Sequence, residues 1–274
     1  MRWQLRTALA LAVVSVFAGL GHAVPNAASP PAVAAVHAQL LVTPSLFQLR
    51  LPEAPVREDP PAPRAPARRS GPVDCAKMRC VALTMDDGPV GATRGVLALL
   101  RRKQVPATFF VVGTQARAHP GLIRRMVADG HVVGNHSWNH PEFWGMSRGA
   151  VRRQLSRTDA VLKRITGKRP VLVRPPFGEL NRKVRSVARA RHQALVLWDV
   201  DPLDWKDRSA TTVARRVLQQ TRRGSIILTH DVWPSTRHAY ARIIDGLRAR
   251  GFTFVTVPQL LGPRTKPGRV YLRR

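Results

Sequence analysis

From residue 81 onward, short apolar runs alternate with amphipathic segments, and this alternation constrains the fold more than any other feature of the chain. Each run has the length and composition of a strand buried on both faces, which is typical of parallel sheets. Repeated strand–helix units imply an α/β fold with right-handed crossovers. Seven strands can close into a barrel slightly short of the usual eight, or lie in an open doubly wound sheet. The expected strands cover 81–85, 107–112, 131–134, 171–173, 194–198, 225–229 and 252–255.

The amphipathic segments between these runs carry helix start and stop signals. Pro120 stands near the first position of one helix, and Ser147 is a good capping residue for another. Gly167 follows the end of the second helix, where a left-handed glycine commonly closes the last turn. The expected helices cover 93–103, 120–129, 147–166, 182–191, 210–223 and 236–250.

The N-terminus has the pattern of an export signal. Arg2 and Arg6 precede an apolar run over 8–20, which is too short for an ordinary membrane span, and Ala23 ends a small-x-small sequence. This pattern predicts a signal peptide over 1–23, with an uncleaved membrane anchor as the alternative. We therefore expect a secreted or cell-wall-associated protein.

Composition divides the rest of the chain into three parts. Residues 24–73 are rich in Ala and Pro and predict a disordered or extended linker. A folded domain over 74–263 and a basic C-terminal tail over 264–274 follow.

Cys75 and Cys80 are the only cysteines, and two cysteines in an exported chain favour one disulfide over a metal site. This bond would pin the entry to the domain.

The net charge of +29 is large for a chain of 274 residues. Residues 1–73 hold seven Arg and three acidic residues, so about +25 lies on the remainder. Such a surface attracts polyanions. For an exported protein we expect an anionic cell wall or membrane surface rather than nucleic acid, and we expect a monomer. The alternative is compositional drift toward Arg with no specific partner.

Polar clusters follow five of the seven expected strands at their C-terminal ends, the face where α/β barrels build active sites. Five independent clusters on one face are hard to explain by structural accident. The clusters are Asp86-Asp87, His136 with His140, Arg174 to Gly178, the segment 199–205, and His230-Asp231.

The histidine pair is the first indication of chemistry. Two histidines four residues apart present both imidazoles to one metal ion if their segment makes a single helical turn. One member of the Asp86-Asp87 pair can supply a third ligand, and the other can act as a general base. The alternative is a structural histidine pair on a loop.

Five motifs, taken in order, resemble those of the polysaccharide deacetylases with a NodB-homology domain, which form carbohydrate esterase family 4. The resemblance runs from about residue 80 to residue 261. It implies a distorted (β/α)7 barrel and metal-dependent removal of N-acetyl groups from amino-sugar polymers. The motifs are Thr84-Met85-Asp86-Asp87-Gly88-Pro89, His136-Ser137-Trp138-Asn139-His140, Arg174-Pro175-Pro176-Phe177-Gly178, Asp201-Pro202-Leu203-Asp204-Trp205 and Leu228-Thr229-His230.

The resemblance implies roles for the first three motifs. Asp86 is implied as the general base, and Arg174 as the arginine that pairs with it. Asp87, His136 and His140 are implied as the metal ligands. Two imidazoles and one carboxylate suit Zn²⁺ or another divalent transition metal such as Co²⁺.

The resemblance also implies how the substrate is held and protonated. His230 corresponds to the general acid for the leaving amine, and Asp204 to the carboxylate that raises its pKa. The backbone N–H of Phe177 corresponds to an oxyanion donor. The family more often has Tyr at this position, so a side-chain contact to sugar is in doubt. Trp205 and Leu228 correspond to residues that line the pocket for the acetyl methyl group.

The motifs leave the polymer open. Peptidoglycan or a chitin-like polymer is the expected substrate, with O-acetylated xylan as the alternative. A non-catalytic cationic wall-binding protein is the alternative from another class, although every catalytic position is present. Trp138, Trp144 and Trp233 lie near the motifs and either stack on sugar rings or pack in the core.

Overall fold

The computed structural model describes residues 73–274. The predicted signal peptide, and the predicted linker up to residue 72, lie outside the described residues. Eight short strands form one sheet in the described part of the chain. They are β1 (Cys80–Asp86), β2 (Thr108–Val111), β3 (Val132–Asn135), β4 (Leu172–Val173), β5 (Ala194–Val196), β6 (Ile226–Ile227), β7 (Thr253–Phe254) and β8 (Val270–Tyr271).

The sheet closes into a distorted (β/α)7 barrel, as the sequence predicts. Neighbouring strands are parallel in the order β6-β1-β2-β3-β4-β5-β8, and β7 pairs with the start of β1. Val200, four residues after the end of β5, forms a β-bridge with Ile227 of β6. The Leu228 N–H donates a hydrogen bond to the Val200 carbonyl at 2.9 Å. This seam joins the β5 side of the sheet to β6, so the arrangement is a barrel rather than an open sheet.

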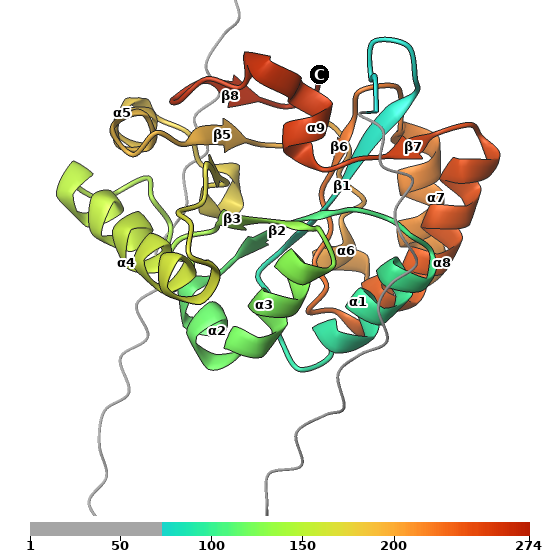
Figure 1. Ribbon diagram of the computed structural model, residues 1–274, viewed down its shortest axis with the longest axis horizontal. Helices are drawn as coiled ribbons and strands as arrows, with labels where there is room; N and C mark the ends of the chain where they lie inside the picture. Colours follow the sequence, from blue (N-terminus) through green and yellow to red (C-terminus); the bar gives the residue numbers. More distant parts are fainter. Residues whose placement is uncertain (1–72) are drawn as a thin grey trace, which may run out of the picture. The chain divides into compact units, whose positions relative to one another are not determined.

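Helices surround the strands (Figure 1). The long ones match the expected segments, with ends that differ by a few residues. The Ser147 side chain accepts a hydrogen bond from the Ala150 N–H, and Gly167 has φ 77°, as predicted for the two ends of α4. The helices are α1 (Thr93–Arg102), α2 (Gly113–Ala118), α3 (Pro120–Ala128), α4 (Arg148–Thr166), α5 (Arg182–Ala190), α6 (Asp204–Asp207), α7 (Ala210–Gln220), α8 (Pro234–Ala249), α9 (Val257–Leu261) and the 3₁₀ turns η1 (Pro176–Gly178) and η2 (Gly262–Arg264).

Three short helices were not predicted. Helices α2, α6 and α9 have six, four and five residues, which is too short for an apolar periodicity to show. None of the helices in residues 73–274 has both the length and the hydropathy needed to cross a membrane.

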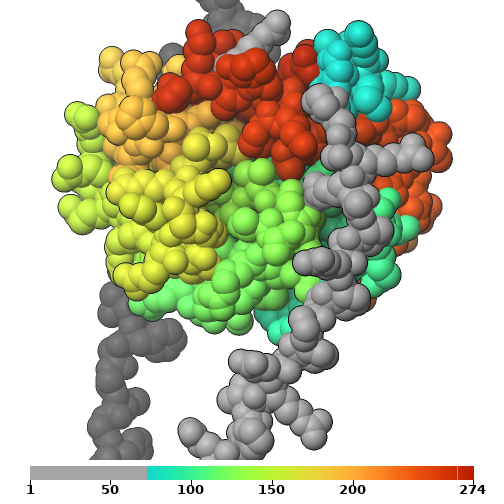
Figure 2. Space-filling model, viewed as in Figure 1, coloured from blue at the N-terminus to red at the C-terminus, as the bar shows by residue number. Residues whose placement is uncertain are grey.

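The central strand β1 is buried along its whole length and pairs with three other strands, β2, β6 and β7. Its first residues, Cys80 and Val81, pair with β7 near the end of the chain. Figure 2 shows the early residues in cyan close to the C-terminal residues in red. A disulfide joins Cys75 to Cys80 at this entry to the domain, the pairing that the sequence favours.

The segment 264–274 differs from the basic tail that the sequence predicts. Residues Val270–Tyr271 form β8, and Tyr271 is buried in a hydrophobic cluster with Leu172 of β4 and Val196 of β5. The Leu197 N–H donates to the Tyr271 carbonyl at 2.8 Å, which ties this segment to the chain after β5. Two strand residues among arginines give no apolar run, so only the tertiary pairing reveals the strand.

Candidate active site

All five polar clusters meet at the C-terminal ends of the strands. They surround a cavity of about 370 Å³. Every residue with a predicted active-site role lines it except Arg174 and Asp204, which are fully buried behind the wall. The lining residues are Asp86, Asp87, His136, His140, Pro175, Phe177, Gly178, Trp198, Asp201, Trp205, Leu228 and His230.

The three predicted metal ligands form one cluster. Their donor atoms, one from each of Asp87, His136 and His140, lie within 4.8 Å of one another. The Nε2 atoms of both histidines lie 3.4 Å from Asp87 Oδ1. The Nδ1 atom of His136 is 2.7 Å from the Arg174 carbonyl oxygen. Because a carbonyl oxygen only accepts, that contact places hydrogen on Nδ1 and leaves the lone pair of Nε2 free to bind a metal ion at the cluster.

The segment that carries the two histidines is a bent loop, so the predicted helical turn is wrong. Ser137 and His140 have φ 68° and 57°, in the left-handed region. The loop is held by side chains: Asn135 Oδ1 accepts from the Ser137 N–H at 2.8 Å, and Ser137 Oγ accepts from the His140 N–H at 3.0 Å. These local bonds replace helical ones and bring both imidazoles to Asp87.

The cluster fits a divalent transition metal. Within residues 73–274, Asp87 Oδ1 is buried and accepts no hydrogen bond, although it faces two imidazoles. Burial alone raises the pKa of Asp87, but the electrostatic interaction with His136, whose Nε2 lies 3.4 Å away, outweighs burial and lowers the pKa to about 2. An ionised carboxylate with two imidazole nitrogens is the donor set that Zn²⁺ and similar ions prefer.

Arg174 holds Asp86 from below the cavity. Arg174 is fully buried, and its Nη1 lies 2.7 Å from Asp86 Oδ1. The same nitrogen donates to Thr84 Oγ1 at 2.8 Å, and Nε donates to the Val196 carbonyl at 3.0 Å. Burial lowers the pKa of Arg174, and Asp86 opposes this shift. With its guanidinium saturated by acceptors, Arg174 can present only one orientation to Asp86.

The His230–Asp204 pair stands on the opposite wall. His230 Nδ1 lies 2.8 Å from Asp204 Oδ1, while Asp204 Oδ2 accepts from the His230 N–H at 2.7 Å and the Thr236 hydroxyl at 2.8 Å. Burial lowers the pKa of His230, but the hydrogen bond and charge of Asp204 outweigh this and raise it to about 9. His230 is therefore an imidazolium at neutral pH, with Nε2 as the remaining proton donor.

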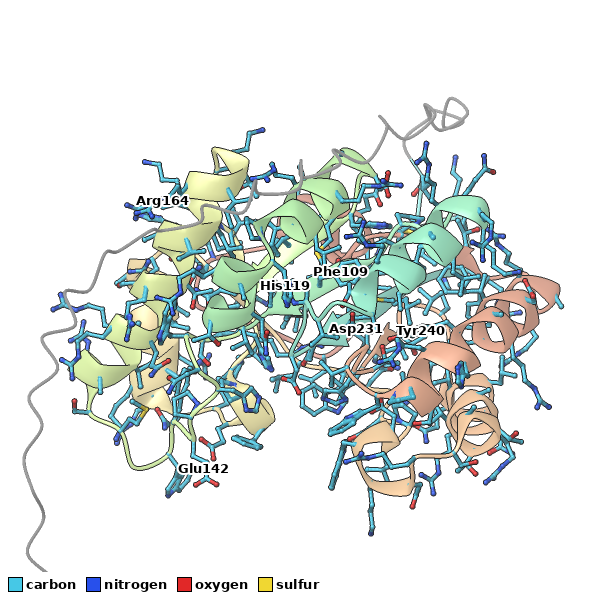
Figure 3. The ribbon with its side chains drawn as sticks, turned by 90° about the horizontal axis from the view of Figure 1, so that it is seen from below. Phe109, His119, Glu142, Arg164, Asp231 and Tyr240 are labelled. Carbon is cyan, nitrogen blue, oxygen red and sulfur yellow. A yellow bond between two sulfur atoms is a disulfide. The ribbon has the colours of Figure 1, made fainter. Side chains whose placement is uncertain are left out.

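Asp231, directly after His230, is a buried carboxylate with no predicted role. Thr93 Oγ1 donates to its Oδ2, and the hydroxyl of Tyr240, which Figure 3 shows close by, bonds to Thr229. A Cβ at Gly88 would lie 2.7 Å from Asp231 Oδ1. Burial raises the pKa of Asp231 to about 6. Asp231 thus packs beneath the turn that follows the Asp86-Asp87 pair.

The mouth of the cavity is aromatic. Phe177 is 61% and Trp205 48% exposed, whereas Leu228 is buried at the base. Phe177 has φ 56°, and its ring lies 4.6 Å from that of His140. Trp198 also lines the cavity. Trp198 is the last residue of the expected strand over 194–198, and the apolar pattern of a strand does not show which of its residues line a cavity.

Asp201 is a second lining residue that was not assigned. Its Oδ1 accepts from the Leu203 N–H at 2.8 Å, as a turn-forming aspartate does.

The three tryptophans near the motifs differ in exposure. Trp138 is buried beneath the Arg157 guanidinium, Trp233 is half-buried beneath that of Arg208, and Trp144 is 70% exposed.

Comparison with known proteins gives consistent matches. The family described as polysaccharide deacetylase matches residues 74–194. The Bacillus subtilis peptidoglycan-N-acetylmuramic acid deacetylase PdaC is 41% identical over 183 residues, which cover 66% of this chain and 38% of the relative. A Bacillus cereus peptidoglycan-N-acetylglucosamine deacetylase is 36% identical over 196 residues, which cover 70% of each chain.

Among solved structures, one described as T48 deacetylase with substrate superposes with a TM-score of 0.70 at 37% identity. The superposition covers 73% of this chain and 99% of that one. The chain spans only about two fifths of the length of some curated relatives, including PdaC. The similarity therefore concerns the barrel and its cavity.

Proposed function

Because the chain belongs to the polysaccharide deacetylase family, we propose that it is a metal-dependent hydrolase that removes N-acetyl groups from N-acetylglucosamine-type residues of a cell-wall polysaccharide. One observation carries the proposal. A metal-ligand cluster, an arginine-held carboxylate and an imidazolium line or support one cavity of about 370 Å³.

Asp87, His136 and His140 would hold the ion, which we propose is Zn²⁺, with Co²⁺ as an alternative. When bound, such an ion polarises the amide carbonyl and lowers the pKa of a coordinated water. Asp86 would accept the proton of the attacking water, and Arg174, whose Nη1 lies 2.7 Å from Asp86 Oδ1, orients its carboxylate. The backbone N–H of Phe177 donates to the developing oxyanion.

His230 completes the reaction on the other side of the scissile bond. An amine leaves as a neutral molecule only if its nitrogen is protonated, and His230, with its pKa raised to about 9, carries that proton at neutral pH. An alkoxide needs this help less than an amine does. The raised pKa therefore supports N-acetyl over O-acetyl substrates. Leu228 and Trp205 offer apolar surface to the acetyl methyl group.

The test is acetate release by the full-length chain. N-acetylglucosamine oligomers, peptidoglycan and acetylxylan are supplied in parallel, with metal content measured by elemental analysis. We expect release from the amino-sugar polymers and loss of activity on chelation, restored by Zn²⁺. If acetylxylan is hydrolysed far better than every amino-sugar polymer, the N-acetyl assignment is wrong.

We propose further that residues 1–23 direct export and that the positive charge retains the protein at an anionic wall or membrane surface. The support is the sequence pattern and a net charge of +29. Retention should weaken as salt rises, because the Debye length falls below about 8 Å above physiological ionic strength. Fractionation of producing cells in graded NaCl tests this, and salt-independent retention would contradict it.

A further inference from the structure

A second hollow opens beside the candidate active site. It has a volume of about 390 Å³ and is lined by Trp144, Asn181, Arg182 and Lys183. The active-site cavity is lined by His140 and, among others, by Gly178. Two chain segments, 140–144 and 178–183, therefore contribute to both hollows.

The reach of these segments limits the separation of the two hollows. Trp144 is four residues from His140, so their Cα atoms lie at most about 14 Å apart. Asn181 is three residues from Gly178, so their Cα atoms lie at most about 11 Å apart. A short oligosaccharide can span such distances while one of its sugars occupies the active-site cavity.

Side-chain bonds hold the two segments to each other. The Glu179 carboxylate accepts hydrogen bonds from the N–H groups of Phe143 and Trp144, the latter at 2.9 Å. Lys183 Nζ donates to the Met146 carbonyl at 2.8 Å. Phe143 is fully buried and anchors its segment in the core. The wall between the hollows is therefore preformed, so that a ligand that lies along it binds with little loss of conformational entropy in the protein.

The hollow combines an aromatic face with positive charge. Trp144 is 70% exposed, the highest value among large apolar side chains in residues 73–274. An indole in this setting offers a flat face for stacking and an N–H donor. Arg182 is exposed and has no hydrogen-bond or ion-pair partner within the same residues.

Two acidic residues, Glu142 and Glu179, lie on the segments that form the hollow, but neither lines it. Glu142 is exposed, and Figure 3 shows it at the edge of the molecule. The Glu179 carboxylate accepts hydrogen bonds from the backbone N–H groups of Phe143 and Trp144. The charged side chains that a ligand in the hollow contacts directly are therefore Arg182 and Lys183.

We propose that this hollow is a subsite for a distal sugar of the bound glycan, which stacks on Trp144 while a carboxylate of that sugar or its substituent pairs with Arg182. The proposal rests on the proposed function and narrows its substrate class. The chain prefers an N-acetylated amino-sugar polymer that carries carboxylates, as peptidoglycan does in its stem peptides and in lactyl groups freed of their peptides, over a neutral chitin-like polymer.

Chain length tests the stacking contact. Kinetics of acetate release are measured for the wild type, Trp144→Ala and Trp144→Phe on the dimer and hexamer of N-acetylglucosamine. We expect Trp144→Ala to lower kcat/KM for the hexamer about tenfold, mainly through KM, and to leave the dimer unchanged. Trp144→Phe should restore most of the loss, because it keeps an aromatic face.

Charge is tested with a peptidoglycan tetrasaccharide freed of stem peptides, and with the same tetrasaccharide after its lactyl carboxylates are reduced to alcohols. Arg182→Gln should lower kcat/KM roughly two- to fivefold on the acidic form only, as expected for an exposed ion pair. Arg185→Gln is the matched control, since Arg185 is exposed on the same helix but does not line the hollow.

The results of these assays distinguish failure of the proposed subsite from failure of the proposed deacetylase function. If Trp144→Ala leaves the hexamer unchanged, or lowers hexamer and dimer equally, the subsite is refuted. If Arg182→Gln affects both tetrasaccharides equally, or no more than Arg185→Gln does, the carboxylate preference is refuted. If the wild type deacetylates none of these glycans, the proposed function fails instead. Calorimetric binding of the hexamer to the wild type and to Trp144→Ala then decides the subsite alone.

Discussion

Replacing Asp204 by Asn should lower the pKa of His230 and remove its proton at neutral pH. In the native pair, Asp204 Oδ1 lies 2.8 Å from His230 Nδ1, and the Asp204 side chain is fully buried. An Asn amide of the same shape can still accept from the His230 N–H and the Thr236 hydroxyl through its oxygen. Its NH₂ group then faces Nδ1, where it favours an unprotonated nitrogen.

The magnitude follows from the raised pKa. Burial opposes protonation, yet Asp204, with smaller contributions from the charges of Asp86 and Asp87, raises the pKa of His230 from 6.5 to about 9. At about 1.4 kcal/mol per unit, this shift corresponds to about 3 kcal/mol in favour of the imidazolium. Because the folded-state pKa lies above the unfolded value, this stabilisation is complete below about pH 6.5. It is lost as the pH rises through about 9.

Two measurements on the metal-free protein check this. Nuclear magnetic resonance titration of the His230 ring should give a pKa near 9 in the wild type and at or below 6.5 in Asp204→Asn. Urea unfolding should show the variant about 3 kcal/mol less stable at pH 6, with a smaller difference at pH 9.5. In the metal-loaded enzyme, the basic limb of kcat/KM should move to lower pH.

Asp201→Asn is the matched control, because Asp201 lines the same cavity but bonds to the Leu203 N–H rather than to His230. It should leave the His230 titration near its wild-type position. A His230 pKa that stays near 9 in Asp204→Asn would refute the assignment of the shift to Asp204. A stability difference that does not change with pH would refute the coupling of this pair to folding.

Three further predictions concern the rest of the site. His140→Ala should abolish stoichiometric binding of Zn²⁺, measured by elemental analysis after dialysis, because it removes one of three ligands; full occupancy in the variant would contradict the ligand set. Asp86→Asn should lower kcat by roughly 10²-fold or more while metal content stays unchanged, and wild-type turnover would show that another group is the base. Gly88→Ala should lower the free energy of unfolding by about 1–3 kcal/mol, because the new Cβ would lie 2.7 Å from Asp231 Oδ1. The loss should be smaller in an Asp231→Ala background, and additive losses in this double-mutant cycle would refute the contact.

The residue pattern alone predicted parallel strands with helical crossovers and the face that carries the site, whereas the choice of a barrel over an open sheet came from the resemblance of the motifs to a family. Short apolar strands that alternate with capped helices can be arranged in few ways, because the connections between parallel strands are right-handed. The carboxyl ends of such strands meet at one face, so residues as distant as Asp86 and His230 had to lie near each other. Five ordered motifs then identified the family, which the comparisons confirm.

Other features depended on contacts that no local pattern encodes. The loop from His136 to His140 is not helical, because the side-chain oxygens of Asn135 and Ser137 accept hydrogen bonds from its left-handed residues, Ser137 and His140. Strand β8 exists only because β5 offers it an unpaired edge. Neither feature has a periodicity that a sequence can reveal.

The chemistry of the cavity likewise required the tertiary structure. Arg174 is held in one orientation because the Val196 and Leu197 carbonyls, the Thr84 hydroxyl and Asp86 accept its hydrogen bonds, and His230 keeps its proton because Asp204 is buried beside it. The hollow at Trp144 and Arg182 forms only where two loops from different strands are bonded together. The sequence determined which groups are present, whereas their orientation and desolvation, on which their chemistry depends, come from packing between distant segments.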